Sequence, residues 1–193
     1  MSGSSQSNFA SRLQALLLQD AHRLQVIEAA ERIVSQAALA DAMLAAGFLR
    51  NCVWDHLHGM AASPLNDVDL IYFDTARLEE QFDLEVEQAL VGELPDVRWE
   101  VKNQARMWKS HADPPYTNSL DAMRYWPEQQ TALGFCLDGS RRVVSPFDLA
   151  PLFAAEIRCG PFRPYSLMRE RADRKKWMQR WPTLHMLRAE KLS

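Results

Sequence analysis

Hydrophobic residues at helical spacing predict two amphipathic helices at the start of the chain. Leucines recur at this spacing in residues 9–18, and a similar apolar stripe runs through residues 21–34. Asn8 is placed to cap the first helix, because its side-chain oxygen accepts hydrogen bonds from free amides at a helix start. We expect both apolar faces to pack on the core, with a partner-binding surface as the alternative. The Ser-rich residues 1–7 predict a disordered start.

The pattern then mixes strands with helices. Residues 42–46 fit either a buried strand that ends in a tight turn at Gly47 or the end of the preceding helix, since alanine favours helix. Residues 49–57 predict a helix that stops near Gly59. The apolar run in residues 67–73 predicts a strand that is partly covered on both faces.

Alternation and turn residues predict the remaining elements. We expect Thr75 to cap an acidic helix over residues 76–90, and the alternating residues 97–102 to form a strand. The other expected elements are short helices at 104–110 and 119–125, a hairpin of 131–137 and 142–145 around Asp138-Gly139, and helices at 148–157 and 165–180. This order predicts an α+β (mixed α/β) fold with a small mixed β-sheet, N-terminal helices and a helical C-terminal segment.

Composition narrows the class of protein. The 193 residues suit one domain, which we place at residues 8–193 with helical extensions at both ends. Hydrophobic residues at 47% and charged residues at 24% exclude collagen-like, coiled-coil and wholly disordered classes. The net charge of -3 excludes a uniformly basic platform for nucleic acid.

The cysteines and the apolar runs indicate the cellular compartment in which we expect the protein. Cys52, Cys136 and Cys159 are widely spaced and lack a CxxC pair, so neither a disulfide scaffold nor a cysteine zinc site is expected. No apolar run is long enough to cross a bilayer, and the start lacks the order of a signal peptide. The sequence predicts a cytoplasmic protein with no membrane partner, and it specifies no oligomeric state.

Two aspartates at the start of a predicted strand are the first candidates for chemistry. Asp67 and Asp69 are one residue apart, so their side chains leave the same face of the strand. Paired carboxylates suit Mg²⁺ (or Mn²⁺), whose remaining ligands are triphosphate oxygens during phosphoryl or nucleotidyl transfer. The alternative is a solvated strand entrance.

The residues around Asp67 and Asp69 resemble a known sequence signature. The segments concerned are Ala46-Gly47-Phe48-Leu49-Arg50-Asn51, Gly59, Pro64 and Asn66-Asp67-Val68-Asp69-Leu70. They resemble the Gly-Gly-x-x-Arg-Asp, Gly, Pro, Asp-x-Asp-Leu signature of the polymerase-β-like nucleotidyltransferase superfamily, especially its tRNA nucleotidyltransferase branch. With Lys102-Asn103-Gln104-Ala105-Arg106-Met107 added, residues 20–185 look like a bacterial nucleotidyltransferase-like family once described as a domain of unknown function. The resemblance implies the nucleotidyltransferase fold, whereas a fold alone does not define the reaction.

The resemblance also implies roles for residues in this signature. Gly47 would turn the chain from a strand into a helix whose amides approach the phosphates of an NTP donor. Asp67 and Asp69 would bind the metal. The first glycine of the signature is Ala46 here, and Asn51 replaces its aspartate.

Arg50 and Asn51 follow the turn and are candidates for binding the nucleotide. A guanidinium at Arg50 is placed to reach a triphosphate beside Gly47. The alternative for Arg50 is a salt bridge to Asp55 or Asp69.

Further polar residues lie on the strand at 97–102 and just after it. Glu100 faces away from the apolar side and is the candidate for a third carboxylate, acting as metal ligand or base. The alternative is an ion pair with a basic neighbour. Asn103 and Arg106 suit sugar, base or phosphate groups, unless Asn103 caps the next helix and Arg106 forms a structural ion pair.

Aromatic and basic residues offer contacts for larger ligands. Among the six tryptophans, Trp108 and Trp126 lie in a loop-rich region and are the candidates for stacking on a base. From Arg163 onward the chain has nine Lys or Arg and three Asp or Glu. This segment either contacts RNA or another polyanion, or forms a solvated helix face.

Two functions follow from these residues. The first is a metal-dependent nucleotidyltransferase that moves an NMP group from an NTP to an acceptor, with small molecules, RNA and proteins all open as acceptors. The alternative is a catalytically degenerate module on the same fold that binds a nucleotide or a protein partner.

Overall fold

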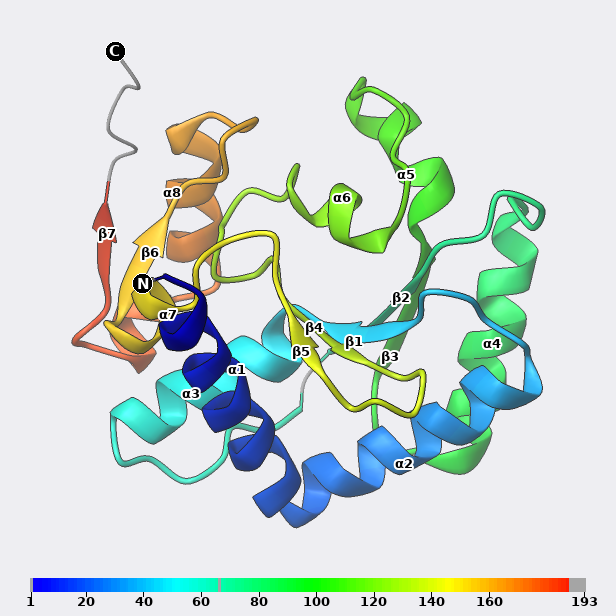
Figure 1. The fold of residues 1–193 in the computed structure, drawn as a ribbon, viewed down its shortest axis with the longest axis horizontal. Coiled ribbons are helices and arrows are strands. Elements are labelled where there is room, and N and C mark those ends of the chain that lie inside the picture. Colours follow the sequence, from blue (N-terminus) through cyan, green and yellow to red (C-terminus); the bar gives the residue numbers. More distant parts are fainter. Residues whose placement is uncertain (1, 66, 188–193) are drawn as a thin grey trace.

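The computed structural model describes residues 2–65 and 67–187 (Figure 1). Its elements are α1 (Ser2–Gln19), α2 (Ala21–Gln36), β1 (Met43–Ala45), α3 (Gly47–Leu57), β2 (Val68–Tyr72), α4 (Glu80–Glu93), β3 (Trp99–Asn103), α5 (Gln104–His111), α6 (Ser119–Met123), β4 (Gly134–Cys136), β5 (Val143–Val144), α7 (Ala150–Phe153), β6 (Glu156–Arg158), α8 (Tyr165–Arg174), α9 (Trp177–Arg180) and β7 (His185–Leu187). The predicted α+β class is confirmed.

The main sheet is mixed, as predicted. Its five strands lie in the order β3-β2-β1-β4-β5. The β2–β3 pair is parallel and the other neighbours are antiparallel. A separate parallel pair, β6–β7, belongs to the C-terminal part. The strand alternative for the alanine-rich segment is confirmed, because Met43–Ala45 pairs with strands on both sides.

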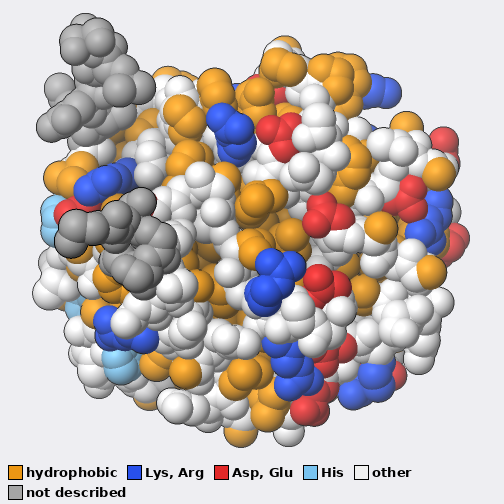
Figure 2. Space-filling view, viewed as in Figure 1, with side chains coloured by type: hydrophobic (Ala, Val, Ile, Leu, Met, Phe, Trp, Pro, Cys, Tyr) orange, Lys and Arg blue, Asp and Glu red, His pale blue; other side chains and the backbone are white. Residues whose placement is uncertain are grey.

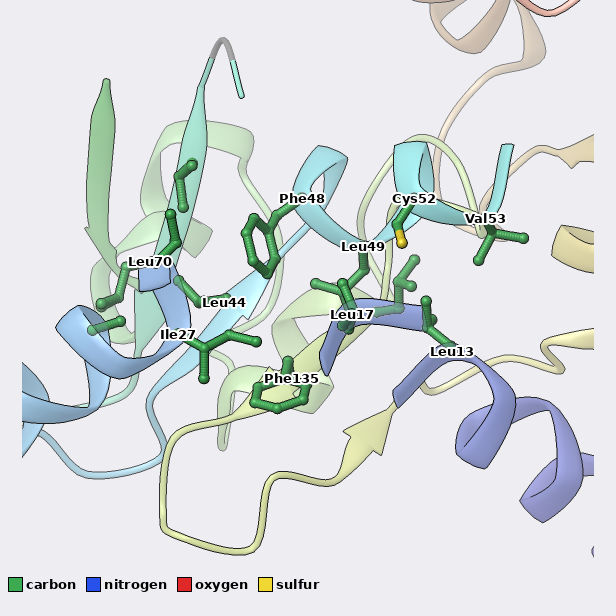
Figure 3. Close-up of a cluster of buried hydrophobic side chains, with 14 of the residues drawn as sticks. Leu13, Leu17, Ile27, Leu44, Phe48, Leu49, Cys52, Val53, Leu70 and Phe135 are labelled. Atoms are coloured by element: carbon green, nitrogen blue, oxygen red, sulfur yellow. The ribbon is translucent and has the colours of Figure 1, made fainter. Parts of the chain in front are cut away.

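The two faces of the main sheet have different surroundings. Leu44 and Leu70 point into the large core beneath α1, α2 and α3, which Figure 3 shows closely packed. Because side chains alternate along a strand, Met43 and Ile71 point to the other face, where the apolar cluster is much smaller. Figure 1 shows α1 and α2 on one side of the sheet and α5, α6 and α8 on the other. The second face is therefore the one free to carry polar side chains.

The start of the chain differs from the sequence prediction. Helix α1 begins at Ser2, so residues 2–7 are helical and not disordered. The Gln6 side chain donates to the carbonyl of Phe147 at 3.1 Å and accepts from the amide of Leu149 at 2.9 Å. These bonds to a distant segment anchor the first helix, and composition alone does not show them.

The acidic helix starts later than predicted. Helix α4 begins at Glu80, and Thr75 is not its cap. Asp74 accepts a hydrogen bond from the amide of Ala76, and Asn103 donates to the carbonyl of Asp74. These bonds keep the preceding residues in a loop, which is a tertiary effect.

The C-terminal half is more interrupted than predicted. The expected helix at 148–157 is reduced to α7, because Ala155 has a φ of 57° and the chain then enters β6. The expected helix at 165–180 is broken at Lys176, whose φ of 54° is left-handed, so that α8 and α9 are separate. Such a backbone conformation ends a helix.

The surface and the helix lengths complete the description. Within the described residues, no helix is both long enough and apolar enough to cross a membrane. On the face in Figure 2, acidic and basic side chains are interspersed, in keeping with the small net charge.

Candidate active site

A cavity of about 820 Å³ lies on the second face of the main sheet. Its walls come from the start of α3, from β2 and β3, from the α5–α6 region and from α8 and α9. Six of the predicted site residues line it, namely Gly47, Arg50, Asn51, Asp67, Asp69 and Glu100. Asn103 and Arg106 are not among its lining residues.

Strand register places the candidate carboxylates on one face of the sheet. Asp69 on β2 lies directly beside Glu100 on the parallel strand β3, and Asp67 immediately precedes β2. Asp69 is partly buried, whereas Glu100 is exposed on the edge strand. The three acidic side chains therefore line one wall of the cavity.

Burial and like charge act on Asp69. Desolvation and the neighbouring Glu100 raise the pKa of the Asp69 carboxyl to about 6, and Asp67 adds to the effect. The positive charges of Lys175 and Arg50 partly oppose it. The charged form of Asp69 is therefore disfavoured, and an additional cation beside the carboxylate would stabilise that form.

The chemistry of this wall suits a hard cation. Oδ1 of Asp67 is buried and has no hydrogen-bond partner among the described residues, although Nε of Arg98 lies 3.3 Å away. Carboxylate oxygens are the ligands that Mg²⁺ prefers. Among the described residues, no three His, Cys, Asp or Glu side chains are close enough together to form a complete metal cluster. Metal binding by Asp67 and Asp69 stays a prediction.

The turn from β1 into α3 borders the carboxylates. Ala46 has φ 56° and ψ -122°, a conformation that favours glycine, and no side chain caps the helix that follows. Gly47 itself is the first helical residue, and a Cβ built there would meet Nη2 of Arg50 at 3.4 Å. The amides in the first turn of a helix have no partner within the helix, so this turn offers donors to an anion.

Arg50 is buried in the wall of the cavity. Its guanidinium lies 4.9 Å from the ring centre of Trp54 and 4.4 Å from that of Trp177. Nη1 donates to Thr131 Oγ1 at 3.0 Å, while Nε and Nη2 donate to Oδ1 of Asn51. Burial lowers the pKa of Arg50 to about 10, an effect that nearby Glu128 partly opposes.

The predicted salt-bridge alternative for Arg50 is not present among the described residues. Asp55 instead accepts hydrogen bonds from Ser63 and from Nε1 of Trp181. Arg50 is thus a buried cation without a direct carboxylate partner, next to a turn with open amides.

Asn103 has the structural role that was the alternative prediction. It is fully buried, and its Oδ1 caps α5 by accepting from Ala105 at 3.0 Å. Its Nδ2 donates to the carbonyls of Asp74 and Arg77, both at 2.7 Å. The side-chain amide of Asn103 is therefore hydrogen-bonded within the protein through both its oxygen and its nitrogen.

Arg106 also forms the structural contact given as its alternative. It is paired with buried Asp83, which additionally accepts from the hydroxyl of Tyr72 at 2.6 Å and from the amide of Asn103 at 3.2 Å. Hydrogen bonding to Asp83 raises the pKa of Arg106 against the opposing effect of burial. Asp83 lies in the acidic helix, where its sequence context gives no sign of this role.

The C-terminal segment supplies site residues that the sequence analysis treated only as a basic run. Arg171 and Lys175 line the cavity, as does Trp177. Glu128 is fully buried and accepts from Nε of Arg171 at 2.7 Å and from Oγ1 of Thr131 at 2.9 Å. A chain of hydrogen bonds therefore runs from Arg171 through Glu128 and Thr131 to Arg50.

Aromatic side chains also line the cavity near α6. Trp126 lines it and Trp108 does not, so one of the two predicted stacking candidates faces the site. Tyr125 lies beside Trp126 and stacks on Phe162, with ring centres 4.5 Å apart.

Solved structures with this fold were found by comparison. An NMR structure described as a CCA-adding enzyme head domain matches with a TM-score of 0.78 and 26% identity, covering 93% of this chain and 96% of the other. A CCA-adding enzyme in complex with CTP matches with a TM-score of 0.59 and 13% identity, over 92% of this chain and 43% of the enzyme. The Thermotoga maritima CCA-adding enzyme complexed with tRNA gives 0.59 and 14%, over 93% and 42%. The chain spans less than half of the last two enzymes.

The family comparison covers most of the chain. No curated protein matches the sequence. A family model described as nucleotidyltransferase matches residues 32–186, a range that includes the turn, the three carboxylates and the C-terminal wall of the cavity. The predicted nucleotidyltransferase fold is confirmed. The chain therefore belongs to the nucleotidyltransferase family.

Proposed function

We propose that this protein transfers an NMP group from an NTP to an acceptor in a metal-dependent reaction. The observation that carries the proposal is the adjacent pair Asp69 and Glu100 on the cavity face of the sheet, beside the turn into α3. The family match and the fold shared with an enzyme that binds CTP support an NTP as the donor. The acceptor stays open among small molecules, RNA and proteins.

Mg²⁺ (or Mn²⁺) fits the residues of the acidic wall. Asp67 and Asp69 would hold it, because one has a buried oxygen that accepts no hydrogen bond and is ion-paired with the exposed Arg98, and burial and like charge raise the pKa of the other. When bound, the ion supplies positive charge to the triphosphate and to the reacting phosphorus.

The other residues position the reactants. The first-turn amides of α3, which begins at Gly47, and the guanidinium of Arg50 bind the triphosphate, with Asn51 holding that guanidinium. An acceptor hydroxyl attacks the α-phosphorus, the bond from this phosphorus to the bridging oxygen breaks, and the electron pair leaves with pyrophosphate. Glu100 is exposed beside Asp69 and accepts the proton of the hydroxyl.

The test measures pyrophosphate release. The protein is incubated with Mg²⁺, each of the four NTPs and separate small-molecule, RNA and protein fractions as acceptor pools. We expect release with at least one combination, and a fall of about a hundredfold or more in Asp67→Asn and Asp69→Asn. Asp96→Asn is the matched control, because Asp96 is exposed and outside the cavity.

The same experiment separates the alternative of a degenerate binding module. One observation favours this alternative. Ala46 adopts a conformation that favours glycine, and its methyl group lies in the turn where phosphates would approach. Such a module binds an NTP in calorimetry but releases no pyrophosphate with any acceptor pool. Release that persists in both aspartate variants would contradict the assignment of these residues.

A further inference from the structure

The C-terminal helix α8 presents a single stripe to the cavity. Arg163 precedes the helix, and Leu167, Arg171 and Lys175 follow at intervals of four residues, all of them lining the cavity. Leu167 and Arg171 lie on one face of α8 because they are four residues apart, and Lys175, the C-cap residue with helical backbone angles, continues this face. Lys175 is exposed, as are Arg169, Arg174 and Lys176, but of these four basic residues it alone lines the cavity.

Lys175 differs from the other two cations of this stripe. Arg163 is paired with Asp113, and Arg171 is paired with the fully buried Glu128. Among the described residues, the Lys175 side chain has no ion pair or hydrogen bond within the protein. It is a cation on the cavity wall whose charge no neighbouring group pairs.

The backbone conformation determines the position of Lys175. Lys175 is the last residue before the left-handed Lys176, and Trp177 then packs edge-on against Trp54 with ring centres 5.4 Å apart. Trp177 also lies against the guanidinium of Arg50, so the segment that carries Lys175 packs beside Arg50, and both cations line the cavity. The charges of Lys175 and Arg50 both act on Asp69 across the cavity.

We propose that Lys175 and Arg50 form a pyrophosphate subsite that binds the β- and γ-phosphates of the donor and the leaving group. This inference rests on the proposed function and assigns the C-terminal segment to it. As the bond to the bridging oxygen breaks, negative charge grows on the departing pyrophosphate, and two unpaired cations opposite the acidic wall stabilise it there. Lys175 supplies charge from a flexible stem, whereas Arg50 is held rigidly by Asn51, Thr131 and two tryptophans.

Inorganic pyrophosphate with Mg²⁺ tests the subsite without any acceptor. Calorimetry is carried out on the wild-type protein and on Lys175→Met, Lys175→Arg and Lys176→Met. We expect Lys175→Met to weaken binding about tenfold or more, Lys175→Arg to retain most of it, and Lys176→Met to bind within about twofold of wild type. Lys176 is the matched control because it is the adjacent lysine and faces away from the cavity.

Two results would overturn the inference. One is equal affinity of Lys175→Met and Lys176→Met for pyrophosphate, and the other is no pyrophosphate binding to the wild-type protein at millimolar concentrations. Failure of the proposed function is a separate result, namely Lys175-dependent pyrophosphate binding with no pyrophosphate release from any NTP. For an active protein, Lys175→Met raises the KM for the NTP and the Ki for pyrophosphate together, a change that a purely structural lysine would not produce.

Discussion

Ala46 adopts a backbone conformation that an alanine enters only at a cost. Its φ of 56° and ψ of -122° lie outside the ordinary left-handed helical region. The conformation turns the chain from β1 into α3, and the residues of this turn line the cavity. The sequence pattern predicts the special turn residue at Gly47, one position later than the structure has it.

Glycine at this position should stabilise the protein. We expect Ala46→Gly to raise the free energy of unfolding by about 1 kcal/mol, because relief of strain exceeds the added chain entropy. Urea unfolding measures it, with Ala45→Gly as the control in the adjacent strand position, where φ is not positive and the substitution should destabilise. Equal losses in both variants would contradict strain at Ala46.

Asp69 should lower the stability of the metal-free protein at neutral pH. Its native pKa of about 6 lies above the ordinary value of 3.8, so the native state binds protons more tightly than the unfolded state. Stability from this group is fully present below about pH 4 and is lost as the pH rises through about 6. A neutral side chain in place of the Asp69 carboxylate removes this loss of stability.

Asp69→Asn therefore tests the electrostatics of the acidic wall. With a chelator present, we expect the variant to be more stable than wild type by about 1 to 3 kcal/mol at pH 8, and the difference to shrink toward pH 4. Unfolding curves at a series of pH values measure this, and Asp96→Asn should give no such trend. A constant difference across the series would refute the role of charge.

At the scale of the elements, the alternation of apolar and polar residues along β3 predicted which of its side chains face the core. Trp99 and Val101 point to the core, so Glu100 between them points to the cavity, as the sequence pattern required. The parallel neighbours Asp69 and Glu100 then follow from strand register, which a single sequence does not contain.

The start of α4, and the choice between the two predicted roles of Asn103, could not be decided from the sequence for a common reason. Asn103 bonds to Asp74 and Arg77, residues that are distant in the chain. A polar residue after a strand has the same appearance whether it binds a ligand or holds a loop. The basic stripe of α8 was visible as a spacing of four, but the cavity that it faces forms only in the folded chain.

Asn103 should be required for stability. We expect Asn103→Ala to cost about 2 to 4 kcal/mol, because it leaves several buried partners without hydrogen bonds. Asn118, an exposed cap of α6, is the matched control, and Asn118→Ala should cost about 1 kcal/mol. If Asn103→Ala fails to fold, Asn103→Asp keeps the cap but loses the two amide donors. A cost no larger than that of Asn118→Ala would contradict the structural role of Asn103.

At the scale of the whole molecule, one buried carboxylate joins the C-terminal segment to the rest. Glu128 receives hydrogen bonds from Arg171 on α8 and from Thr131, which in turn receives one from Arg50 on α3. Both sides of the cavity therefore depend on the same fully buried group.

Removing this carboxylate should loosen the C-terminal wall. We expect Glu128→Ala to cost about 3 to 5 kcal/mol, since it leaves Arg171 without its partner. Amide hydrogen exchange should then accelerate in residues 163–187. Glu156→Ala breaks a partly exposed pair with Arg158 and serves as the control, with an expected cost below about 1 kcal/mol. Unchanged exchange in residues 163–187 would exclude the connection.

The attachment of α1 has a consequence for synthesis on the ribosome. Gln6 bonds to Phe147 and Leu149, and Gln14 bonds to the carbonyl of Arg141 at 2.9 Å. Helix α1 is made before these segments and is therefore unable to complete its contacts until the hairpin and the residues after it have left the exit tunnel. Until then the apolar stripe through Leu13 and Leu17 cannot be fully buried, so the nascent chain exposes an apolar helix face for most of its synthesis.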